Sequence, residues 1–195
     1  MTIAKIKSDI GKYVQNKTWY WYVPGWFVGL YLFFEILQFN PNKQSSLLIM
    51  PAQSFDFFLH EMAHTVTAFL PAVITASAGS LSEILLGSLL VFGAFKTRGY
   101  FASMICSLWL MLACQSAGIY MADARAQKLN LVSLGGALSG SDTATHDWHF
   151  VFGRLHILGL DTLIGNTVRG IGVCAGLFGL SFAAWLIYKM KITKN

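Results

Sequence analysis

The sequence predicts an all-α polytopic membrane protein with about five to six transmembrane helices. Of its 195 residues, 55% are hydrophobic and only 12% are charged, which is about half the charged fraction of a typical soluble domain. The apolar residues lie in long uninterrupted blocks, as bilayer-spanning helices require. A soluble domain of this composition would leave too much apolar surface in water. We therefore expect a single integral membrane domain over residues 1–195.

The first predicted element is an amphipathic helix over residues 1–20 that lies on the membrane surface. Isoleucines and tyrosines recur there at helical spacing with lysines between them, a pattern typical of interfacial helices. The aromatic run from Trp19 to Tyr22 follows and favours the membrane interface. No small-residue cleavage site follows a short apolar core, so we expect no cleavable signal peptide here.

Five membrane-spanning helices are predicted after it. The first contains Glu35, an ionisable residue that is either functional in the bundle interior or close to the far interface. Pro71 should kink or end the second span, and Gly79-Ser80 should form a tight link to the third. The five spans cover residues 23–39, 54–77, 81–95, 100–122 and 170–188.

Two polar connections complete the chain. Residues 126–147 are rich in glycine, serine and threonine, which predicts a loop or re-entrant segment, and residues 129–134 are candidates for a short extended piece. Residues 146–168 are too short and too polar for a span, so we expect an interfacial or re-entrant segment before the last helix.

In the last helix, Gly172 and Gly176 are four residues apart, with Gly179 beyond. Small residues at this spacing let two membrane helices approach closely. We therefore expect this glycine face to pack against a neighbouring helix.

The net charge is +5, and the lysines cluster at the two ends of the chain. Basic ends favour the cytoplasm and anionic lipid headgroups, and they favour a bacterial inner (cytoplasmic) membrane. An odd number of spans would put the two ends on opposite sides, so the orientation stays open. No basic-aromatic pattern points to nucleic acid. The three cysteines lie in apolar segments without Cys-x-x-Cys spacing, which favours neither disulfides nor a thiolate metal site.

The chemistry is concentrated in a His-Glu-x-x-His motif over residues 60–64. His60 and His64 are four residues apart, so on a helix they lie on one face and can share a metal ion, typically Zn²⁺ at about 2.0–2.1 Å. Glu61 would take a proton from a water held by the metal. The alternative is a pair of interior histidines bonded to other helices. Asp56 lies on the same face, where it would either hold the second nitrogen of His60 or cap the helix at the interface.

A catalytic zinc site usually has three protein ligands and one open position. We favour His146 as the third ligand, with Asp147 as the alternative ligand or as a hydrogen-bonding partner of the ligand. The competing interpretation of these two residues is a helix start at the membrane interface. The other candidates with suitable chemistry are Asp123, His149, His156 and Asp161.

A His-Glu-x-x-His motif on an apolar helix, followed roughly ninety residues later by a further nitrogen or oxygen ligand, resembles the site-2-type intramembrane zinc metalloproteases. The resemblance covers Leu59 to Ala68 and the general layout of a few spans. It implies that His60 and His64 bind zinc and that Glu61 is the catalytic base. The third ligand of that family is an aspartate in Leu-Asp-Gly after an Asn-Pro element. Leu160-Asp161-Thr162 lacks both the glycine and the Asn-Pro, so the third ligand stays open.

The resemblance implies hydrolysis of a peptide bond in a membrane-embedded substrate, with Glu61 activating a zinc-bound water. The expected partners are the lipid bilayer and a transmembrane peptide or a lipid. One alternative is a zinc-dependent membrane lipid hydrolase such as an amidase. Another is a diiron oxygenase, which generally needs about eight histidines, whereas this chain has five. The last is a non-enzymatic metal-binding membrane protein, and the oligomeric state stays open throughout.

Overall fold

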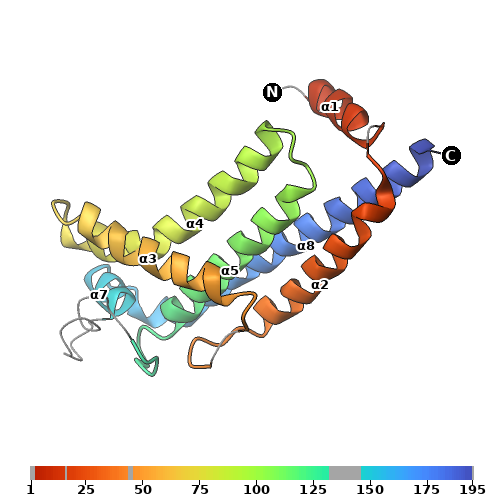
Figure 1. Cartoon of the computed structure of the whole chain (residues 1–195). Helices are drawn as coiled ribbons and strands as arrows, with labels where there is room; N and C mark the ends of the chain where they lie inside the picture. The colour runs from red at the N-terminus through yellow and green to blue at the C-terminus, as the bar shows by residue number, and fades with distance from the viewer. Residues whose placement is uncertain (1–2, 16, 44–45, 132–145, 195) are drawn as a thin grey trace.

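The described part of the chain is built from helices alone (Figure 1). A computed structural model describes residues 3–15, 17–43, 46–131 and 146–194, and the predicted all-α class is confirmed over these ranges. Within these ranges, three helical stretches are long and apolar enough to cross a membrane: Ala72–Lys96, Ala102–Ala122 and Leu158–Thr193. This is consistent with a membrane protein, although it is fewer than the five to six spans that the sequence predicts.

Helix α5 (Ala102–Ala122) is the central helix of the bundle. Helices α2 (Val23–Leu37), α3 (Met50–Val66), α4 (Ala72–Lys96) and α8 (Asp161–Lys194) all contact it, and Figure 1 shows them on different sides of it. Most of the residues of α5 are buried. The other long helices instead keep one apolar face exposed, and on α4 this face is formed by Leu81, Leu85, Leu89 and Phe92. Such a stripe at helical spacing is suited to contact with lipid.

The predicted close packing of the last helix is confirmed. A methyl group built on Gly172 would lie 2.5 Å from Cβ of Cys114, and one built on Gly179 would lie 2.7 Å from Cβ of Ser107. Gly165 packs in the same way against the backbone of Gly118. These glycines let the backbones of α5 and α8 come together along what we call the α5–α8 seam.

The helix predicted over residues 54–77 is two helices in the structure. Helix α3 ends at Val66, and α4 begins after Pro71, which has an extended ψ of 139°. Pro71 cannot donate a backbone hydrogen bond, so the helix cannot continue through it. The link predicted at Gly79-Ser80 is also wrong, because both residues are buried inside α4.

The short elements lie at the two ends of the bundle. Helix α1 (Ile3–Gln15) and the 3-10 turn η1 (Trp19–Trp21) occupy the predicted N-terminal amphipathic segment. Helix α7 (Asp147–Arg154) and η2 (Leu158–Leu160) occupy the segment predicted to be interfacial. Helix α8 then begins at Asp161, earlier than predicted, and the Asp161 carboxylate accepts the backbone N–H of Thr162 (2.7 Å) at the helix start.

The predicted polar loop over 126–147 and the extended piece over 129–134 lie largely outside the described residues. The two ends of the chain and the α4–α5 connection lie at one end of the bundle (Figure 1). The opposite end carries α7, the C-terminal end of α2 and the C-terminal end of α5. The sequence leaves this arrangement open, because an odd number of spans would put the two chain ends on opposite sides of the membrane whereas both basic ends favour the cytoplasm.

Candidate metal centre

The two histidines of the motif lie side by side on α3, with ring centroids 4.8 Å apart. Nδ1 of His60 lies 2.7 Å from Oε1 of Glu83, and Nδ1 of His64 lies 2.8 Å from the carbonyl oxygen of Thr75. Each acceptor favours the tautomer in which Nδ1 carries the proton. The lone pair of each Nε2 is then available to a metal.

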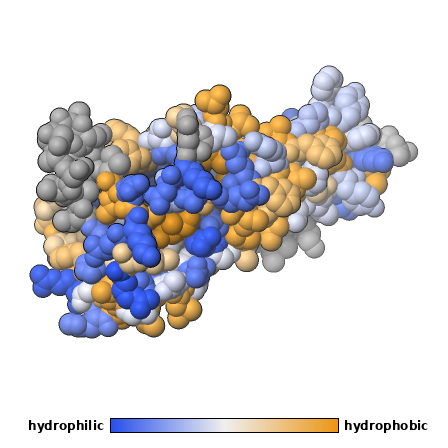
Figure 2. Space-filling model, turned by 90° about the horizontal axis from the view of Figure 1, so that it is seen from below, coloured by the Kyte–Doolittle hydropathy of each residue, from blue (hydrophilic) through white to orange (hydrophobic). Residues whose placement is uncertain are grey.

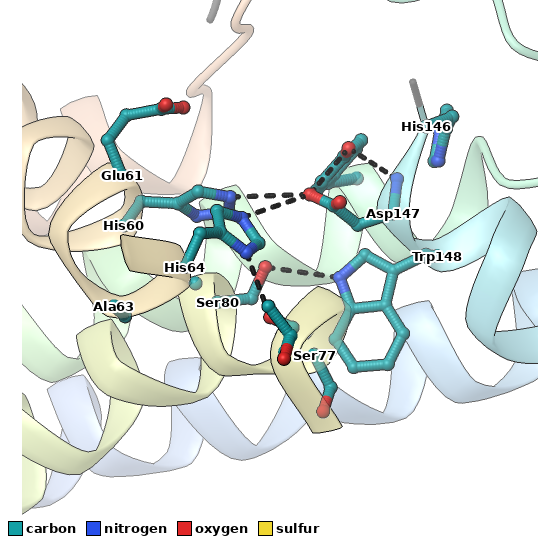
Figure 3. Close-up of polar contacts among 12 residues, drawn as sticks. His60, Glu61, Ala63, His64, Ser77, Ser80, His146, Asp147 and Trp148 are labelled. Atoms are coloured by element: carbon teal, nitrogen blue, oxygen red, sulfur yellow. Dashed lines mark hydrogen bonds and ion pairs between the residues drawn. The ribbon is translucent and has the colours of Figure 1, made fainter. Parts of the chain in front are cut away.

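The third member of the group is Asp147, the first residue of α7. Its Oδ2 lies 3.3 Å from Nε2 of His64 and 3.6 Å from Nε2 of His60. Donors at about 2.0–2.1 Å from one tetrahedral zinc are about 3.3–3.4 Å apart, so these separations fit a shared ion. Within the described residues, His60, His64 and Asp147 are the one group of three or more ligand-type side chains that could hold a metal. Figure 3 shows both imidazoles directed at the Asp147 carboxylate.

Helix α7 is held in place by contacts with α4 and α5. The Tyr120 hydroxyl donates to Oδ2 of Asp147 (3.2 Å) and accepts the Asp147 backbone N–H (2.9 Å). Nε1 of Trp148 donates to the buried Ser80 hydroxyl (3.1 Å). At the helix start, Nδ1 of His146 accepts the backbone N–H of His149 (3.2 Å), so His146 is the N-cap. These contacts fix the direction in which the Asp147 carboxylate points.

Glu83 is a functional candidate that the sequence reasoning missed. It lies on α4 with only 5% of its surface exposed, and its carboxylate is bonded to the His60 ring. A carboxylate behind a metal-binding histidine orients the ring and raises its basicity. The role considered for Asp56 thus falls to Glu83, whereas Asp56 accepts a hydrogen bond from Nε1 of Trp109 (2.8 Å) and joins α3 to α5.

Gly79 makes room for the His60 ring. A methyl group built at this position would collide with three atoms of the imidazole. Gly79 and Glu83 are one helical turn apart on α4, so the same face of α4 supplies the space for the ring and the acceptor for its nitrogen. The sequence did offer a signal for the role of Glu83, because it is an acidic residue one helical turn after a glycine inside an apolar segment.

Glu61 projects from α3 beside His60 and is half-buried (Figure 3). Within the described residues no side chain pairs with its carboxylate. In Figure 3 its carboxylate extends away from the Asp147 carboxylate.

The structure does not bring His146 to the two histidines of α3. The His146 ring is buried against Tyr120, with centroids 4.3 Å apart, and its Nε2 faces Oδ2 of Asp123 at 3.6 Å. Burial lowers the pKa of His146, although the nearby Asp123 carboxylate opposes this. The geometry therefore favours the alternative third ligand, Asp147.

The remaining candidates also lie away from the group. Nδ1 of His149 bonds the carbonyl oxygen of Ala124 (2.8 Å), and His156 is exposed with a positive φ of 58°. Asp161 is buried in an ion pair with Arg125 (2.9 Å). Glu35 lies at the end of α2 beside a separate cavity of about 210 Å³.

The charge of Asp147 suits a metal ligand. Burial by itself raises the pKa of this carboxyl, but the hydrogen bonds and positive charge of His60 and His64 outweigh burial and lower the pKa to about 2. A bound metal ion would displace the proton from Nε2 of each histidine, so the group would then offer two neutral imidazole nitrogens and one ionised oxygen, a donor set typical of zinc sites. These residues fit the ion that the motif predicts.

No protein-family model, curated protein or solved structure matches this chain.

Proposed function

We propose that the protein is a zinc-dependent intramembrane metalloprotease. The observation that carries the proposal is the group of His60, His64 and Asp147, whose donor atoms all lie within 4.8 Å of one another. The group lies in a bundle with three helices suited to a membrane. A bacterial inner membrane is the proposed location, with α2 as a further crossing beyond the three.

His60, His64 and Asp147 would hold the zinc. When bound, zinc supplies a Lewis acid that acidifies a water and polarises a carbonyl group. Glu83 keeps the His60 ring in position through Nδ1, and the carbonyl oxygen of Thr75 does the same for His64. Together these acceptors fix the tautomer that metal binding requires.

Glu61 is the proposed general base. Its carboxylate accepts a proton from the attacking water and returns it to the leaving amine. Tyr120 holds Asp147 through two hydrogen bonds, so the ligand oxygen stays in position while the proton moves.

A second candidate is a zinc-dependent membrane lipid hydrolase such as an amidase. A protease commonly binds its peptide as an added strand, but no strand is present among the described residues of this chain. That observation favours a substrate which needs no strand pairing.

One experiment tests both candidates. The purified protein is incubated with a transmembrane peptide and with a lipid amide, beside Glu61→Gln and the control Glu35→Gln. We expect peptide cleavage to fall by about 10²–10⁴-fold in Glu61→Gln, the usual contribution of a general base, while its zinc content stays at the wild-type value. Glu35→Gln should cleave normally, because Glu35 lies outside the group. Cleavage of the lipid amide alone would support the second candidate, and full activity in Glu61→Gln would contradict both.

A further inference from the structure

The positive charge of the chain is concentrated at one end of the bundle. Helix α1 and the residues after it, the α4–α5 connection and the C-terminal end of α8 all meet there (Figure 1). The single acidic residue of these segments, Asp9, is buried and paired with Arg98 (3.2 Å). Nine of the 14 lysines and arginines belong to this basic end: Lys5, Lys7, Lys12, Lys17, Lys96, Arg98, Lys189, Lys191 and Lys194.

The other half of the bundle has no such excess. Two of its basic residues face a carboxylate or an amide: Arg125 pairs with Asp161, and Arg169 donates to Oε1 of Gln115 (2.9 Å). Figure 2 shows hydrophilic side chains over the end that carries α3 and α7, and a largely apolar surface between that end and the termini. The remaining five basic residues are Lys43, Arg125, Lys128, Arg154 and Arg169.

Aromatic side chains mark the membrane boundary at the basic end. Tyr20 and Trp21 are 52% and 75% exposed. Nζ of Lys189 lies 5.9 Å from the Trp185 ring centroid, and Nζ of Lys191 lies 5.5 Å from that of Trp19. Exposed tryptophan and tyrosine beside lysine are typical of the interface between lipid and water.

The metal centre lies far from this boundary. Seventeen residues of α4 separate Gly79, beneath His60, from Lys96, which is about 25 Å at the rise of an α-helix. Tyr120, beside Asp147, is eighteen residues from Ala102 along α5, or about 27 Å. The hydrocarbon core of a bilayer is about 30 Å thick. The metal centre is therefore close to the membrane surface opposite the basic end.

We infer that the basic end faces the anionic cytoplasmic leaflet and that the metal centre lies near the non-cytoplasmic surface. Lysine and arginine beside membrane helices are retained on the cytoplasmic side, where anionic headgroups attract them. With α2 counted as a fourth crossing, both chain ends share that side, and the conflict that an odd number of spans created is removed. A second conclusion rests on the proposed function: the bond that is hydrolysed lies at the non-cytoplasmic end of a membrane-embedded peptide.

Labelling of single cysteines tests the orientation directly. The native cysteines at 106, 114 and 174 are replaced by alanine, and one cysteine is then introduced at an exposed position. Ser8→Cys and Thr193→Cys report on the basic end, and Ala126→Cys reports on the opposite end. Cells with a permeable outer layer are treated with a membrane-impermeant maleimide, and a detergent-treated sample shows that each cysteine is reactive.

We expect Ala126→Cys to be labelled in intact cells, and Ser8→Cys and Thr193→Cys only after detergent. The reverse pattern would overturn the inferred orientation, and different labelling of Ser8→Cys and Thr193→Cys would overturn the shared position of the termini. Neither readout depends on zinc or hydrolysis, so a failure of the proposed function leaves this test intact.

A variant with fewer lysines tests whether the positive charge of the basic end determines the orientation. Replacing Lys12, Lys17, Lys189 and Lys191 with glutamine should give a mixed orientation, seen as partial labelling at both ends. The matched control replaces Lys43 and Lys128 and should keep the wild-type pattern. If the variant with four lysines replaced keeps the wild-type labelling pattern, the basic end does not determine the orientation.

Discussion

The α5–α8 seam and the metal centre both depend on glycine, but for different reasons. In the seam, glycines such as Gly172 let two helices approach until atoms of one touch those of the other. At the metal centre, Gly79 makes room for a single side chain, the His60 imidazole. A larger residue in the seam must separate two helices, whereas a larger residue at position 79 must displace one ligand. We therefore expect substitutions in the first region to change stability and substitutions in the second to change metal affinity.

Gly172→Leu should give the largest effect on stability. Because a methyl group there already lies 2.5 Å from Cβ of Cys114, we expect a loss of about 1–3 kcal/mol, typical of overpacking. Thermal unfolding in detergent measures it. The control is Gly170→Leu on the same helix, where a methyl group meets nothing within 4 Å. Equal destabilisation by the two variants would contradict the seam.

Gly79→Ala should reduce zinc affinity by about 100-fold, at the upper end of the losses seen when the support of a metal ligand is removed. The added methyl group collides with the His60 ring and moves a ligand. Gly93→Ala lies in open space on the same helix and should bind zinc normally. Zinc competition with a chelator measures both, and a normal affinity in Gly79→Ala would show that His60 is not a ligand in this position.

Glu83→Gln should weaken zinc binding by about tenfold, because an amide oxygen still accepts from Nδ1 of His60 but no longer raises its basicity. Asp56→Asn is the matched control, since Asp56 is equally buried on the neighbouring helix but bonds Trp109. The same chelator competition compares them. A larger loss in Asp56→Asn would return the supporting role to Asp56.

The smallest effect concerns pH in the metal-free protein. The pKa of Asp147 is lowered from 3.8 to about 2, so its ionised form stabilises the folded state above about pH 4, and this contribution is lost as the pH falls towards 2. The unfolding temperature should therefore fall more steeply below pH 4 in the wild type than in Asp147→Asn. If the unfolding temperature falls equally with pH in the two proteins, the Asp147 carboxylate does not stabilise the folded state.

The sequence predicted the features that depend on local spacing. Two histidines four residues apart place both rings on one face of α3 without any knowledge of the other helices. Gly172 and Gly176 likewise predicted a packing face from their spacing alone. The N-terminal amphipathic helix followed from the alternation of apolar and basic residues.

The features that depend on how separate helices cross were not predicted. Glu83 meets His60 only because the chain breaks at Pro71 and α4 returns along α3. The choice between His146 and Asp147 depends on where α7 begins. Since His146 is the N-cap, its ring turns back onto the helix start and Asp147 points at the histidines.

The most direct test of the central claim is the zinc content of the purified protein beside Asp147→Asn and His146→Asn. Asparagine is a good N-cap, so the second variant keeps the start of α7. We predict about one zinc per chain in the wild type and in His146→Asn, and a loss of zinc in Asp147→Asn. Zinc retained in Asp147→Asn but lost in His146→Asn would make His146 the third ligand. A wild-type protein that binds no zinc when zinc is supplied would contradict the metal centre itself.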